Sequence, residues 1–394
     1  MKKKLLFIYP SMIIGGSTTA LLSLLNNLDP EKYEIDLQLF RNQGPLIDML
    51  PKHVNLLPEA EIYKGPKGRL IKILKFVLRG HVARYLMKKC GKGNPSAVLV
   101  SFQVKELSRK NLKEYDYAIG FLEGWSDWYL AFDAVAKVKY AWLHSTYANI
   151  TNDPASELPW MERVDKIVFV TEACREAFDI TLPQMAEKSL AVENITDSNI
   201  IRNRSMQIDK TDAAYKIFAE SNKFKIVTVC RLTISIKGLD RIVTVARELK
   251  KQGYAFLWYI IGDGEDRETL AKLIKGAHVE DCVVSIGMRM NPYPYIAAAD
   301  IMCMPSRYEG KPIVVTESMI LRTPPVVTRY LSAEEQIQNG KVGIVVENSD
   351  GTIFEPLQKC MCDQQLPNLF RSTLQSREYG NADRINEIEK MLFF

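Results

Sequence analysis

The sequence of 394 residues contains no apolar run approaching the roughly 20 residues that a membrane-spanning helix needs. Cysteine is sparse, with seven residues scattered along the chain and no repeated Cys-x-x-Cys pairs. The one close pair, Cys360 and Cys362, is separated by a single residue, which is poor spacing for a zinc knuckle. These absences exclude a membrane-spanning protein and a small disulfide scaffold, and they indicate free thiols in a reducing compartment.

Several catalytic and binding motifs are also missing. No Gly-x-Gly-x-x-Gly fingerprint occurs, so a dinucleotide site is unsupported. The sequence elbows of serine and cysteine hydrolases are absent, as are a helix-turn-helix, a zinc finger and an aromatic RNA-binding motif. Three of the four histidines, His53, His81 and His278, have no motif context. The sequence therefore does not support a dinucleotide-binding enzyme, a hydrolase of these classes or a nucleic-acid-binding protein.

What the chain does contain is an ordinary globular composition, 47% hydrophobic and 25% charged, and its length suggests about two to three domains. It begins with three lysines before the apolar run 5–9, which resembles a signal peptide. Pro10 ends that run early and no small-residue cleavage site follows, so we expect a buried first strand. We therefore expect a cytoplasmic location.

Positive charge is concentrated in one segment, although the net charge of the chain is only +5. The stretch 64–92 contains many Lys and Arg and no Asp or Glu, and Arg69, Lys72, Lys75 and Arg79 share one face of a predicted helix at 69–79. Such a basic amphipathic helix fits an anionic membrane surface, which would make the protein peripheral on the inner face of the cell membrane. A solvated cationic face above a core-facing stripe explains the pattern equally well.

Short apolar runs alternate with amphipathic helical stretches, a pattern typical of an α/β fold with parallel sheets. We expect two doubly wound, Rossmann-like domains that face each other across a cleft at the carboxyl ends of their strands. The first series of expected strands is 5–9, 35–40, 97–100, 117–121, 140–143 and 166–170; the second is 225–229, 256–261, 282–286, 301–304, 325–327 and 343–346. The expected boundaries are an N-terminal domain at 1–200, a polar connection at 201–222, a C-terminal domain at 223–365 and a helical tail at 366–394 that packs on the body.

The most informative motif is the stretch 304–317. An expected strand ends at its start, a turn with Gly310 follows, and a helix begins near Pro312, so Glu309 lies in the loop and Glu317 in the helix. Backbone N–H groups around Gly310, Lys311, Pro312 and Ile313 would face an anionic ligand, and the two carboxylates could bond the hydroxyls of a ribose and of a second sugar. Taken alone, the motif is explained as well by solvated charges at a helix start.

Two cations follow the strand expected at 225–229. Arg231 and Lys237 lie where a ligand diphosphate would be bound, although surface cations are common at such turns. The next strand runs into Gly262-Asp263-Gly264. A turn explains these residues better than a metal site, and we expect no metal.

The N-terminal half offers two weaker signals. Gly15 and Gly16 lie between the first strand and the helix expected at 20–28, where small residues let the backbone approach a phosphate. His144 ends an apolar strand, where a packing role and a role in a cleft are both consistent with the sequence.

Together these motifs resemble the retaining glycosyltransferases of family 4, which have the GT-B fold of two facing Rossmann-like domains. The resemblance covers nearly the whole chain and is strongest at 226–346, where Arg231, Lys237-Gly238, Gly262-Asp263-Gly264, Ser285-Ile286-Gly287 and Glu309-x7-Glu317 occur in family order. The N-terminal half matches more thinly, at Gly15-Gly16, Glu123-Gly124, Trp142-x-His144, Phe169-Val170-Thr171 and Asn194-x-x-Asp197. Two positions depart from the family: Cys230 and Arg322 stand where glycine is usual.

The resemblance implies a role for each matching residue. Arg231 and Lys237 would bind the donor diphosphate, Glu317 the ribose hydroxyls and Glu309 the donor sugar, with His144 beside the transferred sugar. The backbone at Gly310–Ile313 and at Gly15-Gly16 would complete the donor pocket, and Met288 and Arg289 would contact the base. The catalytic set is thus Glu309, Arg231, Lys237 and His144; the donor-binding set is Gly15, Gly16, Met288, Arg289, Gly310, Lys311, Pro312, Ile313 and Glu317.

The expected reaction is the metal-independent, retaining transfer of a sugar from a nucleotide sugar, in particular a UDP-sugar. The acceptor would be a lipid-linked saccharide or a surface polysaccharide precursor, as in capsule or lipopolysaccharide biosynthesis, with no cofactor and no nucleic acid involved. Two alternatives remain open from the sequence: a sugar-nucleotide epimerase of related fold, and a non-catalytic scaffold that binds sugar nucleotides.

Overall fold

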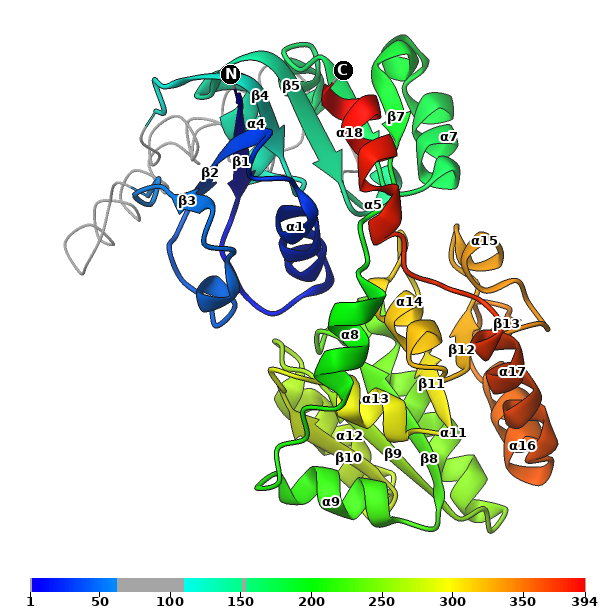
Figure 1. The fold of residues 1–394 in the computed structure, drawn as a ribbon. Coiled ribbons are helices and arrows are strands. Elements are labelled where there is room, and N and C mark those ends of the chain that lie inside the picture. The colour runs from blue at the N-terminus through cyan, green and yellow to red at the C-terminus, as the bar shows by residue number, and fades with distance from the viewer. Residues whose placement is uncertain (1, 62–109, 151–153, 394) are drawn as a thin grey trace. The chain divides into compact units, whose positions relative to one another are not determined.

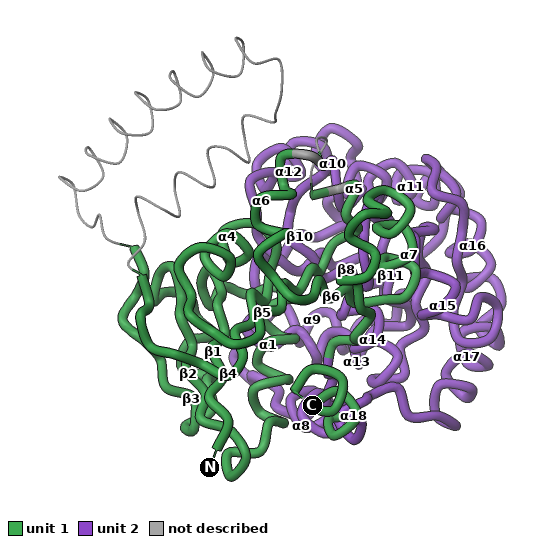
Figure 2. The backbone as a smooth tube through the Cα atoms, turned by 90° about the horizontal axis from the view of Figure 1, so that it is seen from above, with its two compact units in different colours: residues 1–194, 385–394 green, residues 195–384 purple. Residues whose placement is uncertain are grey.

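The computed structural model describes residues 2–61, 110–150 and 154–393, and Figure 1 shows its helices and strands. The chain forms two compact units. Unit 1 comprises Met1–Asn194 and Ile385–Phe394, and unit 2 comprises Ile195–Arg384 (Figure 2). Each unit is an α/β fold built on one parallel sheet, which confirms the predicted fold class. The basic segment 69–79 and the strand expected at 97–100 lie outside the described residues.

The described residues of unit 1 form a seven-stranded sheet in the order β3-β2-β1-β4-β5-β6-β7. Its strands are β1 (Lys3–Tyr9), β2 (Tyr33–Leu39), β3 (Val54–Leu56), β4 (Glu114–Gly120), β5 (Val135–Leu143), β6 (Lys166–Phe169) and β7 (Ser189–Ala191). Its helices are α1 (Gly16–Asn27), η1 (Ile47–Met49), α4 (Trp125–Phe132), α5 (Tyr147–Ile150), η2 (Pro154–Ser156), α6 (Leu158–Met161), α7 (Glu172–Thr181), η3 (Pro183–Lys188) and α18 (Ile385–Phe393). The first strand is almost fully buried from Leu5 to Tyr9, as its apolar run predicted.

Unit 2 contains a six-stranded sheet in the order β10-β9-β8-β11-β12-β13, the strand order 3-2-1-4-5-6 of a Rossmann fold. Its strands are β8 (Phe224–Val229), β9 (Phe256–Ile261), β10 (Val283–Gly287), β11 (Ile301–Met304), β12 (Pro325–Thr328) and β13 (Ile344–Val346). Its helices are α8 (Ser198–Ser205), α9 (Ala213–Glu220), α10 (Ile234–Lys237), α11 (Leu239–Lys251), α12 (Arg267–Gly276), α13 (Tyr293–Ala298), α14 (Ile313–Ile320), α15 (Ala333–Ile337), α16 (Phe354–Cys362), α17 (Gln365–Gln375) and η4 (Ala382–Arg384).

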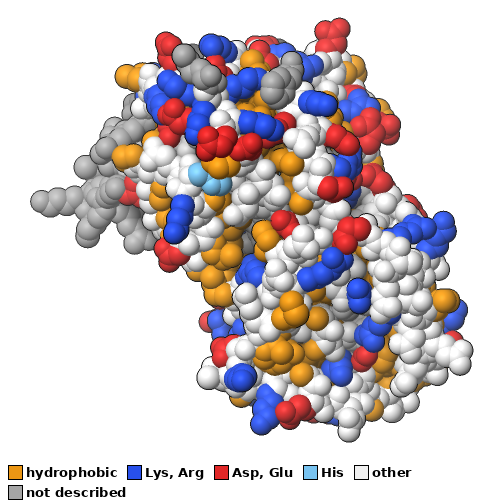
Figure 3. Space-filling model, viewed as in Figure 1, with side chains coloured by type: hydrophobic (Ala, Val, Ile, Leu, Met, Phe, Trp, Pro, Cys, Tyr) orange, Lys and Arg blue, Asp and Glu red, His pale blue; other side chains and the backbone are white. Residues whose placement is uncertain are grey.

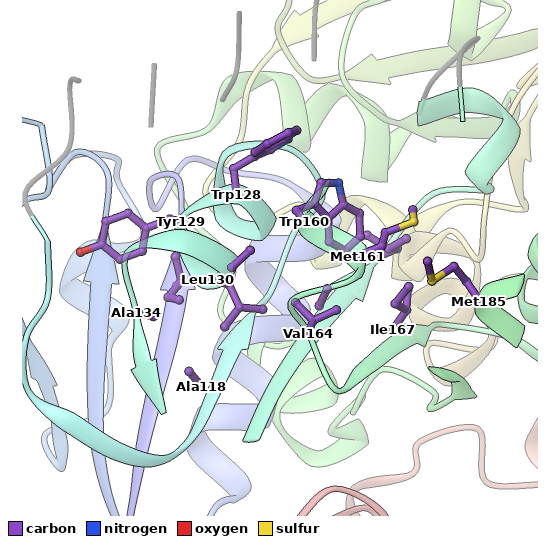
Figure 4. Packing of buried hydrophobic residues seen from close by; sticks show 14 of the residues in the cluster. Ala118, Trp128, Tyr129, Leu130, Ala134, Trp160, Met161, Val164, Ile167 and Met185 are labelled. Carbon is purple, nitrogen blue, oxygen red and sulfur yellow. The ribbon is translucent and has the colours of Figure 1, made fainter. Parts of the chain in front are cut away.

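Aromatic side chains fill much of the core of unit 1 where helices cover the sheet. Figure 4 shows Trp128 and Tyr129 of α4 in the same cluster as Trp160 of α6 and Ile167 of β6, and all four are at most 5% exposed. Burying an aromatic side chain removes a large apolar area from water, which contributes roughly 2 kcal/mol for each one. This packing holds the loops that leave the carboxyl ends of β4 and β5.

The C-terminal helix α18 belongs to unit 1, although it follows the last residue of unit 2 in sequence (Figure 2). The Phe393 ring lies 5.4 Å from Tyr33 and 5.1 Å from Tyr117, and the Phe393 carbonyl accepts a hydrogen bond from the Tyr117 hydroxyl at 2.8 Å. Lys32 pairs with the nearly buried Glu389 at 2.9 Å. The segment expected at 366–394 as one tail therefore divides between the units, with α17 in unit 2.

The polar stretch expected as a connection at 201–222 contains the end of α8 and all of α9, and it belongs to unit 2. Asp197 caps α8 by accepting the N–H groups of Asn199 and Ile200, and Asp212 caps α9 in the same way. Ile201 and Phe218, each at most 4% exposed, insert into the core of unit 2. Asp212, which helps to make this stretch look like a linker, is a helix cap, and the pattern of charge alone does not reveal that role.

The described surface carries charges of both signs. On the face drawn in Figure 3, Lys and Arg side chains are interspersed with Asp and Glu, and hydrophobic side chains gather in patches between them. Within the ranges that the structure describes, none of the helices is both long and apolar enough to cross a membrane.

Candidate functional site

The candidate residues of unit 2 follow the carboxyl ends of three strands of one parallel sheet, β8, β10 and β11. Arg231 and Lys237 follow β8, Met288 and Arg289 follow β10, and the loop with Glu309 follows β11. Because β8 lies between β9 and β11, the sheet reverses its winding there, and ligands of doubly wound sheets bind at such a switch point. Parallel pairing thus brings residues from distant parts of the sequence to one end of the sheet.

A buried ion pair joins the two strongest sequence motifs. Lys237 Nζ lies 2.6 Å from Glu309 Oε1, which also accepts a hydrogen bond from Ser306 Oγ at 2.7 Å. Burial alone would lower the pKa of Lys237, but the Glu309 carboxylate outweighs it and raises that pKa above its ordinary value. Lys237 therefore remains a cation at neutral pH, as binding of a diphosphate requires.

Cys230, one of the two departures from the family pattern, lies in the same surroundings. Burial raises the pKa of its thiol to about 12; the nearby Lys237 ammonium opposes this shift, and the Glu309 carboxylate adds to it. The side chain is therefore a neutral thiol beside the ion pair, so it adds volume but no charge.

Glycine at position 238 allows Lys237 to end α10 beside the β11 loop. Gly238 has φ 63°, in the left-handed region, and a Cβ atom there would lie 2.1 Å from the Pro305 carbonyl oxygen. The same carbonyl accepts a hydrogen bond from the buried Arg241 at 3.1 Å, and Arg241 also pairs with Asp350 at 2.7 Å. The turn that carries Lys237 is thereby held against the loop that carries Glu309.

The β11–α14 loop is held mainly through its carbonyl groups. Gln336 Nε2 donates to the Pro312 carbonyl at 3.0 Å, Asn348 Nδ2 donates to the Arg307 carbonyl at 2.8 Å, and Ser332 Oγ donates to the Gly310 carbonyl. The helix α14 starts directly after Pro312, and the first N–H groups of a helix have no partner within it. Those N–H groups and the helix dipole favour an anion at this loop. The Lys311 ammonium lies 3.7 Å from Glu335, so it is oriented toward α15.

Glu317 occupies a buried position in α14. Its Oε1 accepts a hydrogen bond from the Tyr293 hydroxyl at 2.7 Å, and the residue is 6% exposed. Burial raises the pKa of the Glu317 carboxyl to about 7, while the hydrogen bond from Tyr293 and the Arg204 charge act in the opposite direction. A carboxylate so placed can accept hydrogen bonds from the hydroxyls of a sugar.

Arg231 is the exposed member of the predicted set. Its guanidinium lies 4.0 Å from Glu265, and its side chain is 68% exposed. It is thus available to a ligand at the end of β8, in contrast to the enclosed Lys237.

The glycines after β9 have a steric role. A Cβ atom at Gly262 would lie 1.8 Å from the Cys230 carbonyl oxygen, and one at Gly264 would lie 2.5 Å from the Leu232 carbonyl oxygen. This close approach supports the interpretation of the motif as a turn. Among the residues described, no cluster of three or more His, Cys, Asp or Glu could hold a metal ion.

The two residues after β10 differ in their availability. Met288 is 46% exposed. The Arg289 guanidinium is engaged by the protein, because its Nε donates to Asp212 at 2.9 Å and its Nη1 donates to the Ile286 carbonyl at 2.6 Å. The structure therefore leaves Met288, rather than the Arg289 side chain, open to a planar ligand.

In unit 1, His144 lies at the carboxyl end of β5 among aromatic rings. Its ring centroid is 4.8 Å from that of Phe121, and Asn194 Nδ2 lies 3.4 Å from its Nδ1. Burial lowers the pKa of His144 to about 4, although the nearby Glu123 carboxylate acts in the opposite direction. The Nε2 atom has no hydrogen-bond partner within the described ranges. The imidazole is therefore neutral, with one buried nitrogen available for a polar ligand.

Glu123 holds the loop that follows His144. Its Oε2 accepts the His144 backbone N–H at 2.9 Å, and its Oε1 accepts the Ser145 hydroxyl. The loop after β4 is itself held by the buried Asp127, whose Oδ2 accepts the Gly124 N–H at 2.9 Å. The Glu123-Gly124 motif therefore fixes the backbone around His144.

Gly15 and Gly16 follow β1 in the same unit. Gly15 precedes α1 with an extended φ of 177°, and a Cβ atom there would meet nothing within 4 Å. Neither backbone strain nor packing in unit 1 demands glycine at this position. The open space beside Gly15 is consistent with close approach of a ligand to the backbone.

Three residues of these sites were not singled out by the sequence, namely Ser306, Tyr293 and Arg204. Ser306 lies within the recognised stretch 304–317, three positions before Glu309, so its bond to Glu309 could have been suspected from spacing. Tyr293 of α13 bonds Glu317, and Arg204 of α8 lies over the Tyr293 ring and acts on Glu317 through its charge. Both are more than 20 positions from Glu317 in the chain. No local pattern marks such long-range partners.

Comparisons with known proteins agree with this geometry. Residues 209–373 match the family model described as glycosyl transferases group 1. An uncharacterized glycosyltransferase of Haemophilus influenzae is 29% identical over 234 residues, which are 58% of this chain and 61% of that protein. The amylovoran biosynthesis glycosyltransferase AmsD of Erwinia amylovora is 27% identical over 167 residues, which are 42% of this chain and 46% of that protein. The chain thus spans less than two thirds of the length of these curated relatives.

A solved structure extends the likeness to the whole chain. Alr3699/HepE of Anabaena in complex with UDP-glucose superimposes with a TM-score of 0.71 at 17% identity, covering 99% of this chain and 98% of that one. At this identity the likeness shows the fold, which is the two-domain GT-B fold expected from the sequence.

Proposed function

We propose that this chain, which belongs to the group 1 glycosyltransferases of GT-B fold, transfers a sugar from a nucleotide-sugar donor to a saccharide acceptor. The observation that carries the proposal is the Lys237–Glu309 ion pair at 2.6 Å, next to the loop that begins α14. It joins a protonated amine, a carboxylate and the anion-favouring start of a helix, which together suit a diphosphate and its attached sugar.

In this proposal the donor lies along the carboxyl end of the unit 2 sheet. Lys237, the exposed Arg231 and the backbone at 310–313 bind the diphosphate, and Glu317 accepts the ribose hydroxyls. Glu309 orients Lys237 and bonds the donor sugar, and Met288 contacts the base. In the same proposal, three residues of unit 1 also serve the donor: the neutral Nε2 of His144 can bond a sugar hydroxyl, and the backbone at Gly15 and Gly16 can approach a phosphate.

The chemistry follows from the charge that develops in the reaction. As the bond between the anomeric carbon and the diphosphate oxygen breaks, negative charge grows on the leaving nucleoside diphosphate, which Lys237, Arg231 and the α14 start stabilise. Each tenfold in rate requires about 1.4 kcal/mol of such selective stabilisation. The acceptor hydroxyl bonds to the anomeric carbon on the same face, and its proton passes to the departing phosphate oxygen. The configuration is then retained, and neither a metal nor a strong enzymic base is required.

We propose UDP as the nucleotide, because the solved neighbour from Anabaena is in complex with UDP-glucose. For the acceptor we propose a lipid-linked saccharide or a polysaccharide precursor. A relative named for amylovoran biosynthesis favours a biosynthetic role.

Binding of the lipid-linked acceptor at a membrane rests on the basic segment 69–79, which lies outside the described residues. Replacing Arg69, Lys72, Lys75 and Arg79 by glutamine should weaken sedimentation with anionic liposomes, because each cation near such a surface contributes about 1 kcal/mol. Neutral liposomes serve as the control. Unchanged sedimentation with anionic liposomes would remove the membrane part of the proposal.

The test of the activity is donor turnover. Wild-type protein is incubated with UDP-sugars, with and without saccharide acceptors, in the presence of a chelator, and the products are analysed by NMR. We expect UDP release, a product of unchanged anomeric configuration and no loss of rate on chelation. Lys237→Ala should abolish turnover, whereas Lys250→Ala, which removes a surface lysine paired with Asp281, should leave it unchanged.

The two alternative functions give different outcomes in the same assay. An epimerase would convert the sugar of the donor without any acceptor. A non-catalytic scaffold would bind nucleotides in a thermal-shift assay but release no UDP with any acceptor.

A further inference from the structure

We propose that Tyr293 and Arg204 are positioning residues that orient the Glu317 carboxylate toward the ribose of the donor. The inference rests on the proposed function and goes beyond it by naming two residues outside the recognised motifs. The three side chains come from three helices of unit 2, namely α8, α13 and α14.

Tyr293 is the direct partner of Glu317. It is the first residue of α13 and is 3% exposed, and its hydroxyl donates to Glu317 Oε1 at 2.7 Å. No residue in the described part of the chain donates a hydrogen bond to Glu317 Oε2. The tyrosine therefore occupies one carboxylate oxygen, fixes the rotation of the carboxylate, and leaves the second oxygen to accept from a ligand hydroxyl.

Arg204 supports this arrangement from α8. Its guanidinium carbon lies 4.9 Å from the centroid of the Tyr293 ring, and its Nη2 donates to the Met290 carbonyl at 2.6 Å. Asn291 Nδ2 donates in return to the Arg204 carbonyl at 2.7 Å. These bonds join α8 to the loop that precedes α13, and they hold the Arg204 guanidinium over the Tyr293 ring.

The charge state of Glu317 makes the arrangement testable. The titratable and charged groups that face Glu317 are Tyr293 from α13 and Arg204 from α8, and both favour the ionised carboxylate against the effect of burial. An ionised carboxylate accepts hydrogen bonds from sugar hydroxyls more strongly than a protonated one. Since the pKa of Glu317 is about 7, nucleotide affinity should rise with pH from 5 to about 7 and then level off.

The experiment measures UDP affinity by calorimetry between pH 5.5 and pH 9 for wild type and for Tyr293→Phe, which removes only the hydroxyl. We expect Tyr293→Phe to bind UDP about tenfold more weakly than wild type at pH 6 and to come within about twofold of wild type at pH 9. The reason is that the pH midpoint of UDP binding, set by the ionisation of Glu317, moves to higher pH without the tyrosine hydroxyl. Tyr259→Phe is the matched control, because Tyr259 is a buried tyrosine of the same core cluster with no contact to Glu317. It should leave the midpoint unchanged.

Two further measurements separate positioning from general stability. With 2′-deoxy-UDP, which lacks one ribose hydroxyl, wild type and Tyr293→Phe should differ by much less than with UDP. Arg204→Gln should shift the pH midpoint of UDP binding in the same direction, by a smaller amount. Because Arg204 is partly exposed, this variant tests the proposal even if Tyr293→Phe folds poorly.

The outcomes distinguish this inference from the proposed function. The positioning role is wrong if wild type binds UDP and if Tyr293→Phe and Arg204→Gln bind UDP with the affinity and the pH midpoint of wild type. A loss of affinity in the variants that is the same at every pH, and the same for UDP and 2′-deoxy-UDP, would also overturn the positioning role. If wild type binds neither UDP nor GDP nor ADP at any pH, the proposed function fails first.

Discussion

The Lys237 ammonium group lies 2.6 Å from Glu309 Oε1, although the two residues are 72 positions apart in the chain. Their side chains are 22% and 9% exposed, so each charge is largely removed from water and depends on the other. Removing the Lys237 cation would leave the Glu309 carboxylate enclosed, with the hydrogen bond from Ser306 but without the charge of Lys237, which is unfavourable.

Removing both partners of this pair should destabilise the protein by less than the sum of the two single removals. We expect Lys237→Met to lower the free energy of unfolding by about 3 kcal/mol, because Glu309 then remains buried without its cation. The double variant Lys237→Met/Glu309→Gln should lose at least about 1 kcal/mol less than the sum of the single variants. The free energy of unfolding is measured with urea for wild type, Lys237→Met, Glu309→Gln and the double variant. If the losses of the two single variants simply add in the double variant, the coupling is contradicted.

Two glycines of the chain should respond oppositely to alanine. Gly262→Ala should prevent stable folding, because its Cβ atom would lie 1.8 Å from the Cys230 carbonyl oxygen. Gly15→Ala should leave the melting temperature unchanged, because nothing lies within 4 Å of the added atom and its φ is extended. If the donor approaches the backbone there, the KM for the donor rises in Gly15→Ala. An unchanged KM would exclude Gly15 from the donor pocket.

Arg322 should be replaceable by glycine with a gain in stability. It follows α14 with φ 63°, the left-handed conformation that glycine adopts without strain, and the family usually has glycine there. A non-glycine residue in this region is disfavoured by roughly 1 kcal/mol. Arg322→Gly should therefore raise the urea midpoint, whereas Arg322→Ala, which keeps the Cβ atom, should not. Equal urea midpoints for Arg322→Gly and Arg322→Ala would show that the left-handed backbone at this position does not cost the protein stability.

His144 should make stability depend on pH in a predictable direction. Its pKa is lowered to about 4 in the folded state, against an ordinary value near 6.5 in the unfolded chain. Between these values the unfolded state binds more protons, so the stability that His144 contributes is complete above about pH 6.5 and is lost as the pH falls toward 4. Wild type should lose up to about 2 kcal/mol more than His144→Asn between pH 7 and pH 5.

The measurement for His144 is urea unfolding of both proteins at pH 8, 7, 6 and 5. The difference between their free energies of unfolding should be the same at pH 8 and pH 7 and should change as the pH falls below about 6.5. A parallel decline at every pH would mean that folding does not change the pKa of His144, which would contradict the lowered value.

The predicted strands of the second series agree with the structure to within a residue or two, for example 225–229 against Phe224–Val229. The strands Val54–Leu56 and Ser189–Ala191 were missed, because three residues are too few to carry a periodic pattern. The stretch 201–222 was assigned to a connection because a polar segment can be a linker or a capped helix. Only the burial of Ile201 and Phe218 decides between these alternatives.

By itself the sequence determined the α/β class, the two parallel sheets and the order of the family motifs, because each follows from local periodicity and from turn residues at fixed spacings. Tertiary structure alone decided that Lys237 pairs with Glu309, that Arg289 is engaged by Asp212, and that Tyr293 donates to Glu317. These partners meet because parallel strands bring distant segments to one end of a sheet. A hydrogen bond depends on where two atoms lie in space, which the spacing of residues along a chain does not specify.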